Sequence, residues 1–240
     1  FHKKQMRTHY GVDIKVGEDF LSHIEHPQMR LRLQKSIEIA IKGNVYKDTV
    51  EVESNLGKFI EERYTPIFDE DKVVGVTVFS YEVTERKKYE ANILYLSYND
   101  ALTGLYNRRY FQEEILKLYD QKQTPVSVIQ CDINGLKIMN DAFGHEAGDQ
   151  LLVEVSNVLK NTFESNSIVC RIGGDEFIVI MPKTIYQHAS YMIEKVRIQL
   201  EKKSINGMNV SISYGVATQN ENEDLNEAIR IAEEQMYKHK

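Results

Sequence analysis

Three acidic residues stand where an apolar segment meets a turn, and carboxylates in that position can hold a metal ion. Asp175 and Glu176 directly follow Gly173-Gly174 between two β-branched segments, and Asp132 ends a third apolar segment. An acidic residue at the end of an apolar strand is costly to bury and often marks a metal ligand. If the strands are neighbours, Asp132 and Asp175 converge and, with a backbone carbonyl and substrate phosphates, supply the oxygen ligands that Mg²⁺ prefers. Acidic residues at a hairpin tip are also an ordinary turn solution, and both interpretations stay open at this point.

The two glycines before these acidic residues favour a close approach of a ligand to the backbone. A tight turn through Gly173-Gly174 carries no Cβ, so its N–H groups can meet phosphate oxygens. The half of the chain that contains this turn is acidic, with a net charge of −5 over residues 100–240 against −1 over residues 1–99. Binding of phosphates in this half would therefore require metal cations.

The elements that position these residues form a series of helices and strands in the second half of the chain. Apolar and β-branched runs predict the strands, and apolar residues at helical spacing predict the helices. The order suggests a central sheet with helices packed on it, in which the strands that flank the glycines form a hairpin. The predicted helices are 108–121, 146–163, 185–202 and 224–239, and the predicted strands are 126–133, 167–172, 177–181 and 208–217.

The first half of the chain predicts a separate α+β unit that ends near residue 84. A mixture of apolar and charged residues predicts a helix at 27–42, and three β-rich segments separated by turn residues predict an antiparallel meander. An amphipathic helix at 1–10 has no strand before it, so we expect that part of this domain lies upstream. The predicted strands are 45–52, 58–67 and 72–83.

A charged helix joins the two halves. Tyr89, Ile93 and Leu96 recur at i, i+4 and i+7, which gives this helix one apolar stripe. The stripe can pack on the helix's own domain, or it can pair with the same helix of a second chain as a two-stranded connector. The domain boundaries that we expect are 1–84, 85–99 and 100–240.

Composition excludes several classes of protein. Of the 240 residues, 42% are hydrophobic and 28% are charged, which is typical of a globular chain and not of a disordered or collagen-like one. The net charge of −6 argues against a broad nucleic-acid surface. Cys131 and Cys170 are too few for an extracellular disulfide scaffold, and the longest apolar stretch, 73–81, is too short to cross a bilayer. We therefore expect a cytoplasmic chain without a membrane segment.

Four segments of the second half together resemble the GGDEF domain, the catalytic domain of diguanylate cyclases. The resemblance covers residues 93–240 in family order and spacing. It implies an α+β fold of the palm-like, nucleotidyl-cyclase type that condenses two GTP into cyclic di-GMP and releases two pyrophosphates. Each domain binds one GTP, so the resemblance also implies a homodimer. The four segments are Asp100–Arg109, Asp132–Asp149, Gly173–Phe177 and Ala232–Lys240.

The resemblance gives roles to the residues that match the family's motifs. It implies two Mg²⁺ or Mn²⁺ ions per half-site, bound by the side chains of Asp132 and Asp175 and by the carbonyl of Ile133. It implies catalytic roles for Asp175 at the attacking hydroxyl, for Lys137 as a positive charge on the phosphates, and for Glu176 beside the metal pair. The substrate-binding residues that it implies are Gly135, Leu136, Gly174 and Lys240 for the phosphates and Asn140 and Asp149 for the guanine base.

Two positions depart from the family pattern. Asn134 stands where many members have Asp, which need not harm metal binding. The product-inhibition motif Arg-x-x-Asp would fall on Glu164 and Ser167, so we expect no strong product feedback there. The alternative function is a catalytically silent GGDEF domain that serves as a receptor for GTP or cyclic di-GMP, or as a dimerisation module. The presence of Asp132 and Asp175 disfavours this alternative.

The first unit resembles the latter part of a PAS sensor domain whose first strands are missing. The likeness rests on Tyr64–Phe68, Val73–Val76 and Val83–Lys88, the last of which is a frequent exit from a PAS domain into a connector helix. It implies that an unidentified small-molecule signal at this domain sets the geometry of two GGDEF domains in a homodimer.

Overall fold

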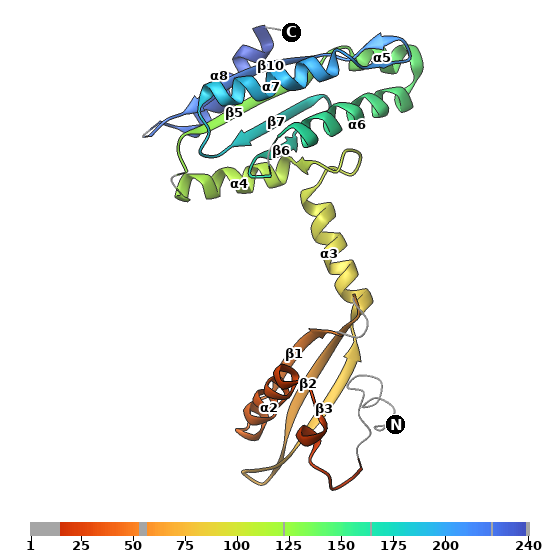
Figure 1. Ribbon diagram of the computed structural model, residues 1–240, viewed down its shortest axis with the longest axis vertical. Helices are drawn as coiled ribbons and strands as arrows, with labels where there is room; N and C mark the ends of the chain where they lie inside the picture. The colour runs from red at the N-terminus through yellow and green to blue at the C-terminus, as the bar shows by residue number, and fades with distance from the viewer. Residues whose placement is uncertain (1–14, 53–56, 122, 164, 222, 239–240) are drawn as a thin grey trace. The chain divides into compact units, whose positions relative to one another are not determined.

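The structure is a computed structural model of the chain (Figure 1) and describes residues 15–52, 57–121, 123–163, 165–221 and 223–238. The chain divides into two compact units, Phe1–Asn92 and Ile93–Lys240. Each unit buries its own apolar side chains. The helix predicted at 1–10 lies outside the described residues, as do Glu164 and Lys240.

The first unit is a three-stranded antiparallel sheet with one helix packed against it (Figure 1). A 3-10 turn, η1 (Phe20–His23), precedes helix α2 (Pro27–Ile41), whose proline suits the first turn of a helix. Leu33 and Ala40 of α2 are buried against Tyr64 of the sheet. The strands, in sheet order, are β1 (Tyr46–Glu51), β2 (Phe59–Asp69) and β3 (Lys72–Glu82). The predicted helix and meander are confirmed, whereas the PAS assignment stays a prediction.

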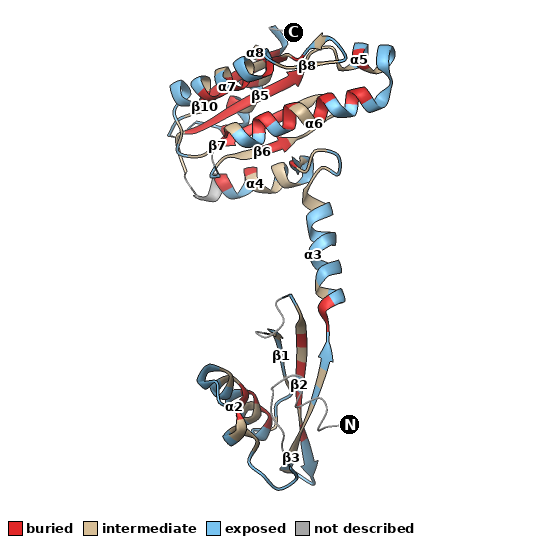
Figure 2. Cartoon of the chain, turned by 45° about the vertical axis from the view of Figure 1, so that its right-hand side comes forward, coloured by how far each residue is buried: buried red, intermediate tan, exposed pale blue. Residues whose placement is uncertain are grey.

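Helix α3 (Thr84–Tyr98) links the last strand of the first unit to the second unit. The division between the units falls inside this helix. Most of α3 is exposed in Figure 2. The apolar stripe is exposed with the rest, since Tyr89, Ile93 and Leu96 are 64%, 67% and 54% exposed. No residue of the stripe is therefore covered by the unit to which it belongs.

The second unit is built on a five-stranded sheet. Its neighbouring strands are antiparallel except at one edge, where a two-residue strand runs parallel to the strand beside it. All eight residues of β5 are buried, because side chains on both faces of this strand are covered by helices. In sheet order the strands are β10 (Ile212–Gln219), β5 (Val126–Ile133), β7 (Glu176–Met181), β6 (Ile168–Arg171) and β4 (Tyr106–Asn107).

Two hydrophobic clusters lie on the two faces of this sheet. One cluster joins Ile129 and Cys131 of β5 to helices α6 (His145–Thr162) and α7 (Tyr186–Leu200). The other joins Val128 of the same strand to helices α4 (Arg108–Gln121) and α8 (Leu225–Lys238). Alternate residues of a strand point to opposite faces, so the helix pairs cover opposite sides of the sheet. Both cysteines are buried free thiols, and burial raises the pKa of Cys170 to about 12.

The predicted elements of the second unit are confirmed with one error and two omissions. The strand predicted at 208–217 corresponds to β10 but its start is wrong, because β8 (Ser204–Ile205) and β9 (Met208–Asn209) form a small hairpin before β10 begins at Ile212. The two-residue strand β4 and helix α5 (Leu136–Phe143) are not among the predicted elements. Gly144, with a φ of 83°, separates α5 from α6.

Candidate active site

The end of β5 lies beside the start of β7, so the acidic residues of both strands meet at one edge of the sheet. Asp132 is directly opposite Glu176 in the register of the two strands. The backbone N–H of Ile133 donates to the carbonyl oxygen of Asp175 at 3.1 Å. Asp132 is buried, with 1% of its surface exposed, while Asp175 and Glu176 are half-buried. The prediction that the two strands are neighbours is therefore confirmed.

The glycine turn between β6 and β7 leaves room for the side chain of Glu176. A Cβ on Gly173 would lie 2.7 Å from Oε2 of Glu176, so only glycine lets this carboxylate fold back over the turn. The hydroxyl of Tyr237, on α8, donates to Oε1 of Glu176 at 3.3 Å. Gly174 is exposed, and a Cβ placed on it would meet no atom within 4 Å. The side of Gly174 that would carry a Cβ is thus unobstructed, and its contact with phosphates stays a prediction.

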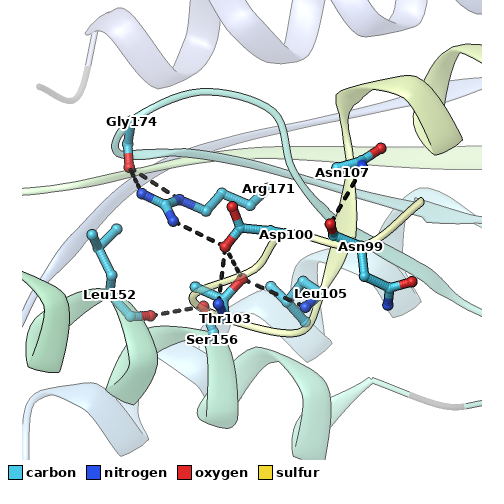
Figure 3. A network of polar contacts seen from close by, with 9 residues as sticks. All are labelled: Asn99, Asp100, Thr103, Leu105, Asn107, Leu152, Ser156, Arg171 and Gly174. Atoms are coloured by element: carbon cyan, nitrogen blue, oxygen red, sulfur yellow. Dashed lines mark hydrogen bonds and ion pairs between the residues drawn. The ribbon is translucent and has the colours of Figure 1, made fainter. Parts of the chain in front are cut away.

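Arg171 ties the turn to the segment that follows α3 (Figure 3). Its Nη2 and Nε donate to the carbonyl oxygen of Gly174 at 2.8 and 3.2 Å, and its Nη1 donates to Oδ1 of Asp100 at 2.9 Å. Burial raises the pKa of the Asp100 carboxyl, but hydrogen bonds from Thr103 and Arg171 outweigh it and hold that pKa below its ordinary value. Asp100 and Arg171 have no role among the residues predicted for the site, although Asp100 begins one of the four family segments and Arg171 lies two residues before another.

The turn after β5 is fixed to β10 by an asparagine. The side chain of Asn134 donates through Nδ2 to Ser211 Oγ at 3.2 Å and accepts from Ser213 Oγ through Oδ1 at 2.8 Å. Gly135 then adopts a φ of 76° as the N-cap of α5, and Leu136 is the first helical residue. The first N–H groups of a helix have no partner within it and favour anions. This geometry suits the phosphate-binding role predicted for Gly135 and Leu136, and the exposed Lys137 follows in the same turn.

The two residues predicted to read the base lie on neighbouring helices. Asn140 is half-buried on α5, and Asp149 is exposed on the first part of α6. The helices follow each other around Gly144, whose N–H donates to the carbonyl oxygen of Asn140 at 2.9 Å. The fold thus places both polar groups on one helical hairpin beside the turn that is predicted to bind phosphates.

The donors at this sheet edge are oxygen atoms, which fit a hard divalent cation. They are the carboxylates of Asp132 and Asp175 and the backbone carbonyl of Ile133. Among the residues that the structure describes, no three His, Cys, Asp or Glu side chains are grouped so that they could hold a metal ion. The proposed donor set has only two such side chains, and it needs the backbone carbonyl and substrate phosphates to complete it. Lys240, which was predicted to contact phosphates, lies outside the described residues.

Comparison with known proteins identifies the family. The protein-family model described as "Diguanylate cyclase, GGDEF domain" matches residues 97–240. The chain belongs to the GGDEF family. Its second unit is therefore a GGDEF domain, and members of this family generally use divalent metal ions.

Curated relatives agree with this assignment. Diguanylate cyclase DgcM of Escherichia coli strain K12 is 30% identical over 165 residues, which are 67% of this chain and 40% of that protein. Diguanylate cyclase A of Treponema denticola is 27% identical over 246 residues, which cover 89% of this chain and 66% of that protein. The chain thus spans less than two thirds of the length of these relatives.

The crystal structure of the coiled coil and GGDEF domain of DgcB from Caulobacter crescentus, in complex with c-di-GMP, has the same fold. The TM-score is 0.60 at 22% sequence identity, over 65% of this chain and 86% of that chain. The mixed α and β fold predicted for the second unit is confirmed by this likeness. In the part of the chain that the structure describes, no helix has the length and apolar character needed to span a membrane.

Proposed function

We propose that this chain is a diguanylate cyclase that condenses two GTP into cyclic di-GMP and releases two pyrophosphates. The observation that carries the proposal is the meeting of Asp132, Asp175 and Glu176 at one sheet edge of a GGDEF domain. The phosphate-binding turn at Gly135 continues directly from the same strand. Oxygen atoms that can bind a metal ion and helix N–H groups that can bind phosphates lie at adjoining positions, and a nucleoside triphosphate can be bound by both.

Different residues of the site would bind the metal ions, orient the attacking hydroxyl and bind the phosphates. Asp132, Asp175 and the carbonyl of Ile133 would hold Mg²⁺ or Mn²⁺, two ions per half-site. Bound metal supplies positive charge to the phosphoryl oxygens and acidifies the attacking 3′-hydroxyl. The Asp175 carboxylate orients that hydroxyl, and Glu176 assists beside the metal pair. The N–H groups of Gly135 and Leu136, together with Gly174, Lys137 and Lys240, hold the phosphates, so that the reacting atoms are already in place.

Specificity for GTP comes from Asn140 and Asp149. The Asn140 amide offers both a donor and an acceptor, while the Asp149 carboxylate accepts from N–H groups. The guanine edge presents a carbonyl acceptor together with N–H donors, and adenine presents a different pattern. The proposal therefore has GTP, and not ATP, at both half-sites.

Catalysis requires two GGDEF domains that face each other, so we propose a homodimer. The exposed stripe of α3 supports this proposal, because apolar side chains at helical spacing favour pairing with a second helix. The first unit would act as a PAS-type sensor in the cytoplasm, where a small-molecule signal changes the geometry of the two domains. Its helix and antiparallel strands are compatible with this role.

A product assay with a matched pair of variants tests the activity. The purified chain is incubated with GTP and Mg²⁺, and the nucleotides are separated by chromatography. Cyclic di-GMP and pyrophosphate are expected from the wild type and from Asp141→Ala, which removes an exposed carboxylate of α5. Asp175→Ala should lower turnover by about a thousandfold or more with an unchanged melting temperature, because it removes a metal ligand.

The two other outcomes separate this proposal from its alternative. Unaltered GTP with tight GTP binding by the wild type would favour a silent receptor domain. Full turnover by Asp175→Ala would contradict the role given to that carboxylate.

A further inference from the structure

The backbone of Gly148 is in contact with the side chain of Asn140 across the packed helices α5 and α6. A Cβ built on Gly148 would lie 1.9 Å from Oδ1, 2.8 Å from Cγ and 3.3 Å from Nδ2 of Asn140. All three atoms of the carboxamide thus occupy the place that a side chain at position 148 would take. Gly148 itself is buried.

The backbone conformation does not explain a glycine at position 148. Gly148 lies inside α6 and is absent from the glycines with positive φ in the structure. Glycine in a helix interior is less favourable than alanine, so a helical position with ordinary dihedral angles favours alanine. Alanine does not fit at this position because its methyl group would overlap the carboxamide of Asn140.

We infer that Gly148 is a positioning residue for guanine recognition. The missing side chain seats the carboxamide of Asn140 on α6, one residue before Asp149. This inference rests on the proposed function, in which Asn140 and Asp149 read the guanine base together. Gly148 touches neither the base nor the phosphates, and it acts only through Asn140.

The consequence of a methyl group at position 148 follows from which atoms can move. A distance of 1.9 Å is far shorter than any non-bonded carbon–oxygen contact, so either the helix backbone or the carboxamide must shift when the methyl group is added. The carboxamide is the end of a short side chain that is only half-buried, whereas α6 packs into the main hydrophobic cluster. The carboxamide therefore moves and the helix stays, so that the fold is kept while the hydrogen bonds to guanine are lost.

Binding of unreactive nucleotides tests the inference directly. The probes are 3′-deoxy-GTP and 3′-deoxy-ATP with Mg²⁺, which lack the attacking hydroxyl, and binding is measured by calorimetry. Gly148→Ala is expected to bind 3′-deoxy-GTP about tenfold more weakly than the wild type, the effect of losing about one hydrogen bond to a base. Its affinity for 3′-deoxy-ATP should stay within about twofold, and its melting temperature should be no lower than that of the wild type.

A second background isolates the contact with Asn140. In Asn140→Ala the carboxamide is gone, so adding Gly148→Ala should change 3′-deoxy-GTP binding no further. Asn157→Ala, an exposed position on the same helix, controls for the gain in helix propensity and should bind both nucleotides like the wild type.

The possible results are distinct. Wild-type affinity of Gly148→Ala for 3′-deoxy-GTP, an equal loss for both nucleotides, or additive losses in the double variant would each overturn the inference. A wild type that does not prefer 3′-deoxy-GTP would overturn the proposed guanine site itself, and the inference with it. A preference that is present in the wild type and unchanged in Gly148→Ala would overturn the inference alone.

Discussion

Asp100 holds together two segments that are distant in the sequence. Its Oδ1 accepts hydrogen bonds from the N–H and the hydroxyl of Thr103, at 2.9 and 2.7 Å, and from Arg171 at 2.9 Å. Arg171 in turn donates to the carbonyl oxygen of Gly174. Charge-assisted hydrogen bonds therefore connect Asp100, through Arg171, to the hairpin tip that carries Asp175.

Replacing this carboxylate should produce a stability defect that depends on pH. Asp100→Asn is expected to lower the stability of the second unit by about 1 to 2 kcal/mol at pH 7, because it removes a charged acceptor at a partly solvated site. The folded pKa of Asp100 is below its ordinary value of 3.8, so its stabilising effect is present above that value and is lost as the pH falls through the folded pKa. The difference in melting temperature between the two proteins should therefore shrink below about pH 4.

The control for this prediction is Asp141→Asn, which neutralises an exposed carboxylate elsewhere in the same unit. Thermal unfolding of the three proteins is followed between pH 7 and pH 3. A difference between wild type and Asp100→Asn that stays constant over that range would mean that the carboxylate's charge plays no part in holding the hairpin.

The sequence predicted that the strands carrying Asp132 and Asp175 are neighbours, but it did not predict the contacts that hold the glycine turn in place. Asp132 and Asp175 were expected to converge, because each follows an apolar strand and neighbouring strands bring their ends together. The bond between Asp100 and Arg171 spans 71 residues and depends on the parallel pairing of β4 with β6. A strand of two residues has no apolar periodicity, so the sequence could not reveal that pairing.

Close packing of α8 on β10 requires a glycine in the strand. A Cβ on Gly215 would lie 2.0 Å from the carbonyl oxygen of Ala232 and 2.7 Å from the backbone nitrogen of Met236. The N–H of the next residue, Val216, donates to Oε1 of Gln235 at 3.1 Å. The backbones of the strand and the helix are thus in direct contact at this glycine. An added side chain would have to displace backbone atoms, which cannot rotate away as a flexible side chain can.

Gly215→Ala should therefore destabilise the second unit by about 1 to 3 kcal/mol or more, because α8 must move away from the sheet. Chemical denaturation measures the effect. Gly75→Ala is the matched control, since it also lies in an antiparallel strand but its added Cβ would meet its nearest atom, Cδ1 of Ile67, at an ordinary 3.5 Å. Equal stabilities for Gly215→Ala and the wild type would show that α8 does not approach the strand this closely.

The elements themselves were predictable where the apolar pattern was long. The predicted bounds of α4 and β5 agree with the structure, because each has a sustained apolar pattern and clear turn residues around it. The start of β10 was wrong, since Val210 continues the apolar run although the chain leaves the β9 hairpin there. Only tertiary pairing with β5 fixes where β10 begins.

At the scale of the whole molecule, α3 carries apolar side chains that its own chain leaves exposed. Its stripe of Tyr89, Ile93 and Leu96 is 64%, 67% and 54% exposed. Large apolar side chains in one exposed stripe of a helix favour a partner that covers them. A second copy of the same helix fits the proposed reaction, because cyclic di-GMP contains one nucleotide from each of two domains.

Introducing charge into the stripe should separate dimerisation from nucleotide binding. Ile93→Glu is expected to reduce turnover at micromolar protein by at least about tenfold, because like charges would face each other across the paired helices. Its affinity for 3′-deoxy-GTP should not change, since each domain binds its own nucleotide. Sedimentation and the dependence of specific activity on protein concentration report the change.

Ala91→Glu places the same charge on the opposite side of α3, where it should leave both oligomeric state and turnover unchanged. The comparison distinguishes pairing through the stripe from a general effect of charge on the helix. A dimer of Ile93→Glu that sediments and turns over like the wild type would show that the two GGDEF domains meet without the stripe. The proposed sensor role of the first unit would then require a route to the GGDEF domain that does not depend on this face of α3.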